Sequence, residues 1–102
     1  MFPVITTPKA DRDSDVFFFY IAQESPKSAL EFLERLEETY SIISEFPFIA
    51  SVFPTSNPAL SEIRWIPIKE FPNHLVFYSV NNQEITVIRI LHKTQDIVKI
   101  LA

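Results

Sequence analysis

The stretch from Ile63 to Ile97, IRWIPIKEFPNHLVFYSVNNQEITVIRILHKTQDI, decides the fold of this chain. Its apolar segments are rich in Ile, Val, Phe and Tyr, and an F-P-N-H corner and an N-N-Q turn separate them. These segments span residues 63–69, 74–80 and 84–92. Side chains of these types favour strands, and short polar turns between them favour antiparallel pairing. We therefore predict a three-stranded antiparallel meander, followed by a short tail helix that Asp96 caps.

The local chemistry of this meander adds three expectations. Because the chain has no glycine, positions with positive φ must use residues such as asparagine, and Asn81-Asn82 is expected to form a primed hairpin turn. Pro67 cannot donate a backbone hydrogen bond, which predicts a sheet edge or a bulge at that point. Strand 84–92 is apolar on both faces, so it is expected to lie centrally with both faces covered.

The first half of the chain predicts a short strand and two helices. Residues 4–7 are β-branched or small enough for a strand, and a helix is expected over 11–24 with Asp11 or Asp13 as its cap. Ser25-Pro26 is a typical helix start, and apolar residues at helical spacing continue the second helix to Phe46. The two helices are expected to form a hairpin.

Residues 47–60 contain three prolines and lack periodicity, so they are expected to form a loop. Its four apolar side chains are expected to face the core: Phe48, Ile49, Val52 and Phe53. The resulting order is β-α-α-β-β-β, with a final short helix. The fold class is α+β, with a helical hairpin packed on a small, mainly antiparallel sheet, and residues 1–102 are interpreted as a single domain.

Composition excludes several classes of function. Without cysteine there is no thiolate site, and without glycine there is neither a P-loop nor a dinucleotide fingerprint, so no cofactor is expected. Only two histidines are present, and no ligands stand at metal spacing, so no metal is expected. The net charge of −4 is a weak basis for nucleic-acid binding. No membrane span or secretory signal is visible, and a cytoplasmic location is expected.

Several motifs resemble those of the RelE/ParE toxin family, and its ParE branch in particular. In the last third they are Arg64, Phe71-Pro72, Phe77-Tyr78, Arg89-Ile90-Leu91-His92 and Asp96-Ile97. The helices add Asp13 with Phe17 and Tyr20-Ile21-Ala22, Ser25-Pro26 with Ala29, Phe32 and Leu36, and the closing Glu45-Phe46-Pro47. The resemblance covers nearly the whole chain. Two positions differ: Lys93 stands where the family usually has Gly, and Gln95 where it often has Arg.

The resemblance implies the toxin of a type II toxin–antitoxin, or plasmid stabilisation, system. Its partner would be a cognate antitoxin whose extended or helical segment wraps the toxin, as a hetero-oligomer, and a homodimer is also compatible. ParE members poison DNA gyrase without cleaving a substrate, whereas RelE members cut mRNA in the ribosome. The ParE-like function is preferred here. The alternatives are a RelE-like mRNA endonuclease and an inactive member that serves as an interaction module.

Four residues of the meander are candidates for a catalytic or binding site: Arg64, Arg89, His92 and Lys93. Two guanidiniums could converge on a phosphate or an acidic partner, and a histidine could act as acid or base. The structural alternative pairs Arg89 with Asp96 or another acid, and Arg64 with Glu62 or Glu70. His92 is then a packing residue on the strand face opposite Arg89, and His74 is expected to be exposed.

Phe18 is the remaining candidate. It belongs to the run Phe17-Phe18-Phe19-Tyr20, which cannot place all of its rings on the core side of one helix. Phe18 or Phe19 must therefore either pack beneath the loop 47–60 or line an apolar groove for the antitoxin.

Overall fold

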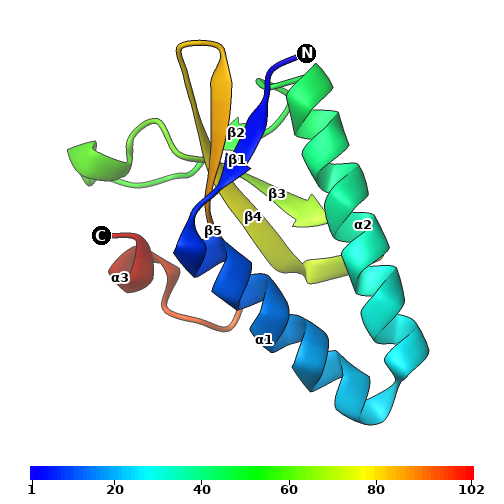
Figure 1. Ribbon diagram of the computed structural model, residues 1–102. Coiled ribbons are helices and arrows are strands. Elements are labelled where there is room, and N and C mark those ends of the chain that lie inside the picture. Colours follow the sequence, from blue (N-terminus) through cyan, green and yellow to red (C-terminus); the bar gives the residue numbers. More distant parts are fainter.

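The computed structural model describes residues 1–102, and its architecture is two α-helices packed on a five-stranded sheet (Figure 1). The strands lie in the order β1-β5-β4-β3-β2, with β1 parallel to β5 and the other neighbours antiparallel. The elements are β1 (Val4–Thr6), α1 (Pro8–Glu24), α2 (Pro26–Glu45), β2 (Ser51–Val52), a 3-10 helix (Pro58–Leu60), β3 (Arg64–Ile68), β4 (Phe71–Asn81), β5 (Glu84–His92) and α3 (Ile97–Leu101). The predicted α+β class and the helical hairpin are confirmed.

Both faces of the sheet are covered, as predicted for β5, which is an interior strand between β1 and β4, although β4 is the middle strand of the five. Phe32 and Ile43 of α2 pack on one face against Val76 and Val87, and this cluster forms the larger core. On the other face, Leu91 belongs to a smaller core closed by side chains of α3 and of the segment around the 3-10 helix. In Figure 1, α3 accordingly lies on the side of the sheet away from α2.

The first helix starts earlier than the sequence predicted, because Thr7 caps it. The Oγ1 atom of Thr7 accepts a hydrogen bond from Ala10 N at 3.0 Å and donates one to Ile88 O at 2.7 Å. Pro8 then occupies the first turn, where its missing amide hydrogen costs nothing. The expected capping by Asp11 or Asp13 is wrong. Asp13 lies inside the helix and is free to face the sheet.

The second helix begins as predicted. Ser25 caps it by accepting a hydrogen bond from Ser28 N at 3.1 Å, Pro26 is its first residue, and it ends at Glu45.

Neither helix of the hairpin carries an apolar stretch sufficient to span a lipid bilayer.

The meander is present, but its first turn is not at the F-P-N-H corner. Those four residues belong to β4, and the chain reverses at Lys69-Glu70 instead. Glu70 adopts a positive φ of 69°, and its carboxylate accepts a hydrogen bond from Arg35 Nε on α2 at 2.8 Å. A shift in strand register follows Pro67, which confirms the predicted bulge.

The β4–β5 hairpin has the primed turn predicted, one residue later in the chain. Asn82 and Gln83 have φ values of 50° and 60°, whereas Asn81 still pairs with Glu84 in the ladder. Two successive positive φ values define this turn type, whose twist matches that of the flanking strands.

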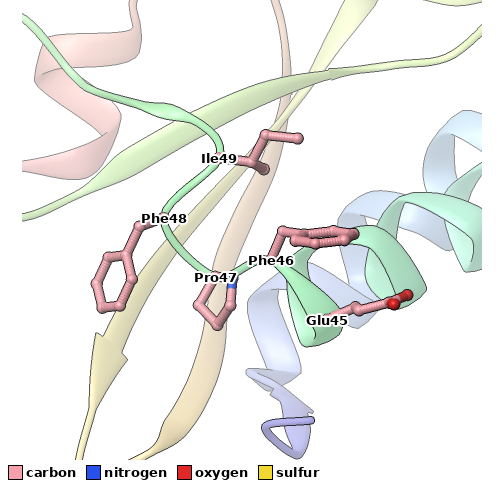
Figure 2. Close-up of a pocket in the computed structure, with 5 residues that line it drawn as sticks. All are labelled: Glu45, Phe46, Pro47, Phe48 and Ile49. Carbon is pink, nitrogen blue, oxygen red and sulfur yellow. The ribbon is translucent and has the colours of Figure 1, made fainter.

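Residues 47–60 form the predicted loop apart from β2 and the 3-10 helix, but the expected burial of its apolar side chains is mostly wrong. Phe48 and Ile49 are 62% and 59% exposed, and only Phe53 reaches the core, where its ring lies edge-on to Phe77. The segment is held through its backbone instead, because Tyr78 Oη donates to Pro47 O at 2.8 Å. Figure 2 shows the ring of Phe48 pointing away from Phe46 and from the end of α2.

Candidate functional site

A hollow of about 350 Å³ lies between the exposed side of α1 and the end of the β4–β5 ladder. We call it the α1–β5 groove. Its lining residues are Val16, Phe17, Tyr20, Ile21, His74, His92 and Thr94. Helical spacing places the four α1 residues on one side of that helix. The two histidines are 18 positions apart in the chain, and they lie together because His74 pairs with His92 in the sheet.

His74 lies deep in the groove and not in solvent, so its expected exposure is wrong. Its ring sits edge-on to Phe17 and Phe32, with ring centroids 4.7 and 5.2 Å away. Burial, and to a smaller extent the neighbouring His92, lowers the pKa of His74 to about 4. His74 is therefore neutral near neutral pH, and its buried Nδ1 atom has no hydrogen-bond partner.

His92 stands at the mouth of the groove, with its ring centroid 4.9 Å from that of His74. Its Nδ1 atom accepts a hydrogen bond from Thr94 N at 3.2 Å and lies 2.8 Å from Thr94 Oγ1. In the neutral ring the proton consequently belongs to Nε2. Gln95 Oε1 accepts from His92 N at 2.7 Å, so this residue braces the turn that carries the histidine.

Lys93 is part of the same turn but does not line the groove. Its backbone N donates to Asn73 O at 2.8 Å, and its side chain is exposed to solvent. The lysine is thus placed as a free positive charge beside His92 at the rim.

Arg89 is occupied by an acidic partner. Its Nε and Nη2 atoms donate to the two carboxylate oxygens of Asp13 at 2.7 and 2.9 Å, and Ile90 N donates to the same carboxylate at 3.0 Å. These hydrogen bonds raise the pKa of Arg89 above its usual value. The structural interpretation of Arg89 therefore holds, but the partner is Asp13. Asp96 caps α3, as the sequence predicted.

Arg64 lies elsewhere on the sheet, and neither Glu62 nor Glu70 pairs with it. Its Nη1 atom donates to Ala50 O at 2.6 Å, and its guanidinium lies 5.0 Å from the ring centre of Phe48. The four ion pairs of the structure all belong to Arg35 or Arg89. Arg64 is therefore anchored but keeps an uncompensated charge.

Phe18 is partly buried, and its ring lies edge-on to Phe19 with centroids 5.3 Å apart. It does not line the α1–β5 groove, whereas Phe17 and Tyr20 on either side of it do. The sequence singled out Phe18 and Phe19 as the rings that leave the core side, and it did not mark Phe17 or Tyr20. The signal for the groove was the aromatic run itself, which has more rings than one core-facing stripe can bury.

The arrangement separates the two arginine candidates from His92, which keeps only Lys93 beside it. Arg89 and His92 pair with Phe77 and His74, which are three residues apart on β4, and this places them on opposite faces as predicted. Arg64 lines a different hollow. No group of three or more acidic, histidine or cysteine side chains could hold a metal ion. The open feature is an apolar groove with a histidine at its mouth, which suits the binding of an apolar side chain.

Comparisons with known proteins identify the family to which this fold belongs. A family model described as the ParE toxin of the type II toxin–antitoxin system, parDE, matches residues 4–97. No curated protein matches at a significant level. Among solved structures, a chain of the chromosomal ParDE toxin–antitoxin system from P. aeruginosa is similar in fold, with a TM-score of 0.71 and 20% identity over 90% of this chain and 96% of that chain. Because the family model spans almost all of its residues, the chain belongs to the ParE toxin family of type II toxin–antitoxin systems.

Proposed function

We propose that this protein is the toxin of a ParDE-type pair, that it acts by binding and poisoning DNA gyrase, and that a cognate antitoxin neutralises it. The observation that carries the proposal is the separation of the two arginine candidates from His92. Arg89 is bound by Asp13 and Arg64 by Ala50, while the open surface beside His92 is apolar. Such a surface favours recognition of a protein over catalysis on a phosphate.

RNA cleavage needs a base, an acid and a cation around one phosphate. His92 is the only histidine at the mouth of the groove, and burial keeps its neighbour His74 neutral. The guanidinium of Arg89 is already engaged by a carboxylate, and the whole chain carries a net charge of −4. These features give little attraction for a polyanion, so they support a protein target.

The antitoxin is proposed to lay an amphipathic segment along the α1–β5 groove. Val16 and Tyr20 are one helical turn apart on α1, and both are more than half exposed although their side chains are large and partly apolar. A partner helix or strand that presents apolar side chains at matching intervals would cover them. Lys93 at the rim would then face an acidic residue of the partner.

Induced expression in a bacterial host tests the function, with growth, the DNA-damage response and mRNA integrity scored together. The expected result is growth arrest with DNA breaks and intact mRNA, reversed by co-expression of the antitoxin. Purified chain should also inhibit supercoiling by purified gyrase. Asp13→Ala serves as a control. Because Asp13 stabilises the fold, this variant should lose toxicity only in proportion to its loss of folded protein.

Two other outcomes would replace the proposal. Arrest with rapid mRNA cleavage would identify a ribosome-dependent endonuclease, and His92→Gln should then abolish cleavage. Folded protein without arrest would identify an inactive member that serves as an interaction module. In that case Gln95 should be mutated first. Its side chain holds the turn after β5, and the family often has Arg at this position.

A further inference from the structure

A second surface of the molecule has a composition unlike the rest. Residues 46–61 contain no charged side chain, although the whole chain has nine basic and thirteen acidic residues. We call residues 46–52 the apolar segment. Four of its large side chains are more than 40% exposed: Phe46, Phe48, Ile49 and Val52. Exposed apolar side chains gathered in this way mark an interaction surface.

The apolar segment is held rigidly by groups from the sheet. Tyr78 Oη donates to Pro47 O at 2.8 Å, and Arg64 Nη1 donates to Ala50 O at 2.6 Å. Ala50 itself is buried, and Phe53 N, just beyond the segment, donates to Ile63 O at 2.6 Å. A fixed backbone loses little entropy on binding, so its exposed side chains form a preorganised surface.

Arg64 and Glu45, which are opposite in charge, stand at the two ends of this surface, and Glu62 lines the same hollow as Arg64 without an ion pair to it. The guanidinium of Arg64 lies over the ring of Phe48, and no carboxylate pairs with it. Glu45 lines the hollow of about 400 Å³ formed with residues 46–49, and it also has no ion pair. Figure 2 shows Glu45 and Phe48 on opposite sides of Pro47, so the positive and negative ends are well separated.

We propose that the apolar segment is a self-association surface, on which two copies of this chain pack about a twofold axis. A twofold interface brings the same patch of each copy together. Every contact between two different residues therefore occurs twice, once in each direction. With the axis near Pro47, Arg64 of each copy faces Glu45 of the other. Over most of the remaining surface two copies with a net charge of −4 repel each other, whereas this patch carries no charge between its ends.

Sedimentation equilibrium of the purified full chain, over about 1 to 100 µM, tests this proposal. The expected result is a dimer whose dissociation constant rises at least about tenfold in Phe48→Ser and in Ile49→Ser. Both residues are mostly exposed, so the variants should keep the circular dichroism spectrum and melting temperature of the parent. Phe19→Ser is the matched control, because Phe19 is 65% exposed on α1, and it should leave the dimer intact.

Charge reversal gives a second and independent readout. Glu45→Arg should weaken the dimer more than Glu45→Gln does, because only the arginine places two positive charges opposite each other, and Arg64 with its bond to Ala50 O is left intact in both variants. A monomer throughout the concentration range would overturn the proposal. So would a dimer that Phe48→Ser and Ile49→Ser leave unchanged, or one that Phe19→Ser disrupts equally.

Discussion

Asp13 on α1 and Arg89 on β5 form a two-pronged ion pair, with N–O distances of 2.7 and 2.9 Å, between residues 76 positions apart. The Asp13 side chain is 14% exposed and that of Arg89 20%, so the pair is largely shielded from water. The same carboxylate accepts Ile90 N. This one contact fixes the first helix against the central strand, and it removes Arg89 from the set of available cations.

Loss of either partner should destabilise the fold. Asp13→Ala leaves a shielded guanidinium and the Ile90 amide without acceptors, and we expect a loss of about 2–4 kcal/mol in the free energy of unfolding. Urea denaturation measures this change. Asp15→Ala, which removes an exposed acid from the same helix, should change it by less than about 0.5 kcal/mol. An equally small effect of Asp13→Ala would contradict the assigned role.

The His74 environment should make stability depend on pH. Its folded pKa of about 4 lies below the unfolded value of 6.5, so the unfolded chain binds more protons between these values. Stability is then complete above about pH 6.5 and falls as the pH drops towards 4. After allowance for partial solvent exposure, we expect a loss of about 1 kcal/mol between roughly pH 7 and pH 5.

His74→Phe is the variant that isolates this effect, because it keeps an aromatic ring among Phe17, Phe32 and Phe71. Unfolding of the variant at both pH values should show a flatter dependence than the parent. An unchanged slope would assign the pH effect to other groups.

Tyr78 should control how firmly the apolar segment is held. Its side chain is fully buried and donates to Pro47 O, and burial raises the pKa of Tyr78. Tyr78→Phe removes the donor while keeping the ring, so we expect a loss of about 1–2 kcal/mol in unfolding free energy. Hydrogen exchange should become faster at residues 48–50. Tyr40→Phe is the matched control, since no hydrogen bond is found at the Tyr40 hydroxyl, and it should leave exchange there unaltered.

Mutations in the α1–β5 groove should weaken the binding of the antitoxin to this protein. Tyr20 is 72% exposed, so Tyr20→Ala removes contact area without disturbing the core, and we expect the antitoxin to bind about tenfold or more weakly. Isothermal titration calorimetry with the cognate antitoxin measures this. Phe19→Ala, on the neighbouring side of the same helix, should have little effect. Equal losses in the two variants would mean that the antitoxin covers α1 broadly.

The sequence was sufficient where local chemistry decides the outcome. Ser25-Pro26 started α2, the spacing of apolar residues defined its buried side, and the uninterrupted apolar character of residues 84–92 identified the central strand. A bulge at Pro67 follows from its missing amide hydrogen. The motifs carried by these same elements led to the family.

Local signals failed where a distant residue competed with them. Asp13 resembled a helix cap, but Thr7 was also available and could bond to Ile88 on the neighbouring strand. The F-P-N-H run resembled a corner, but Arg35 on α2 could hold Glu70 in the turn. Phe48 and Ile49 resembled core residues, but the folded chain leaves both of them more than half exposed.

The sequence by itself therefore determined the order of the elements other than β2 and the 3-10 helix, the buried side of α2 and the family, because periodicity and capping act over one or two turns of chain. The tertiary structure alone decided the candidate site. Strand register and helix placement decide which carboxylate binds Arg89. They also bring His74 against His92 and Phe17. These are set by packing among residues far apart in the chain, and no local pattern specifies them.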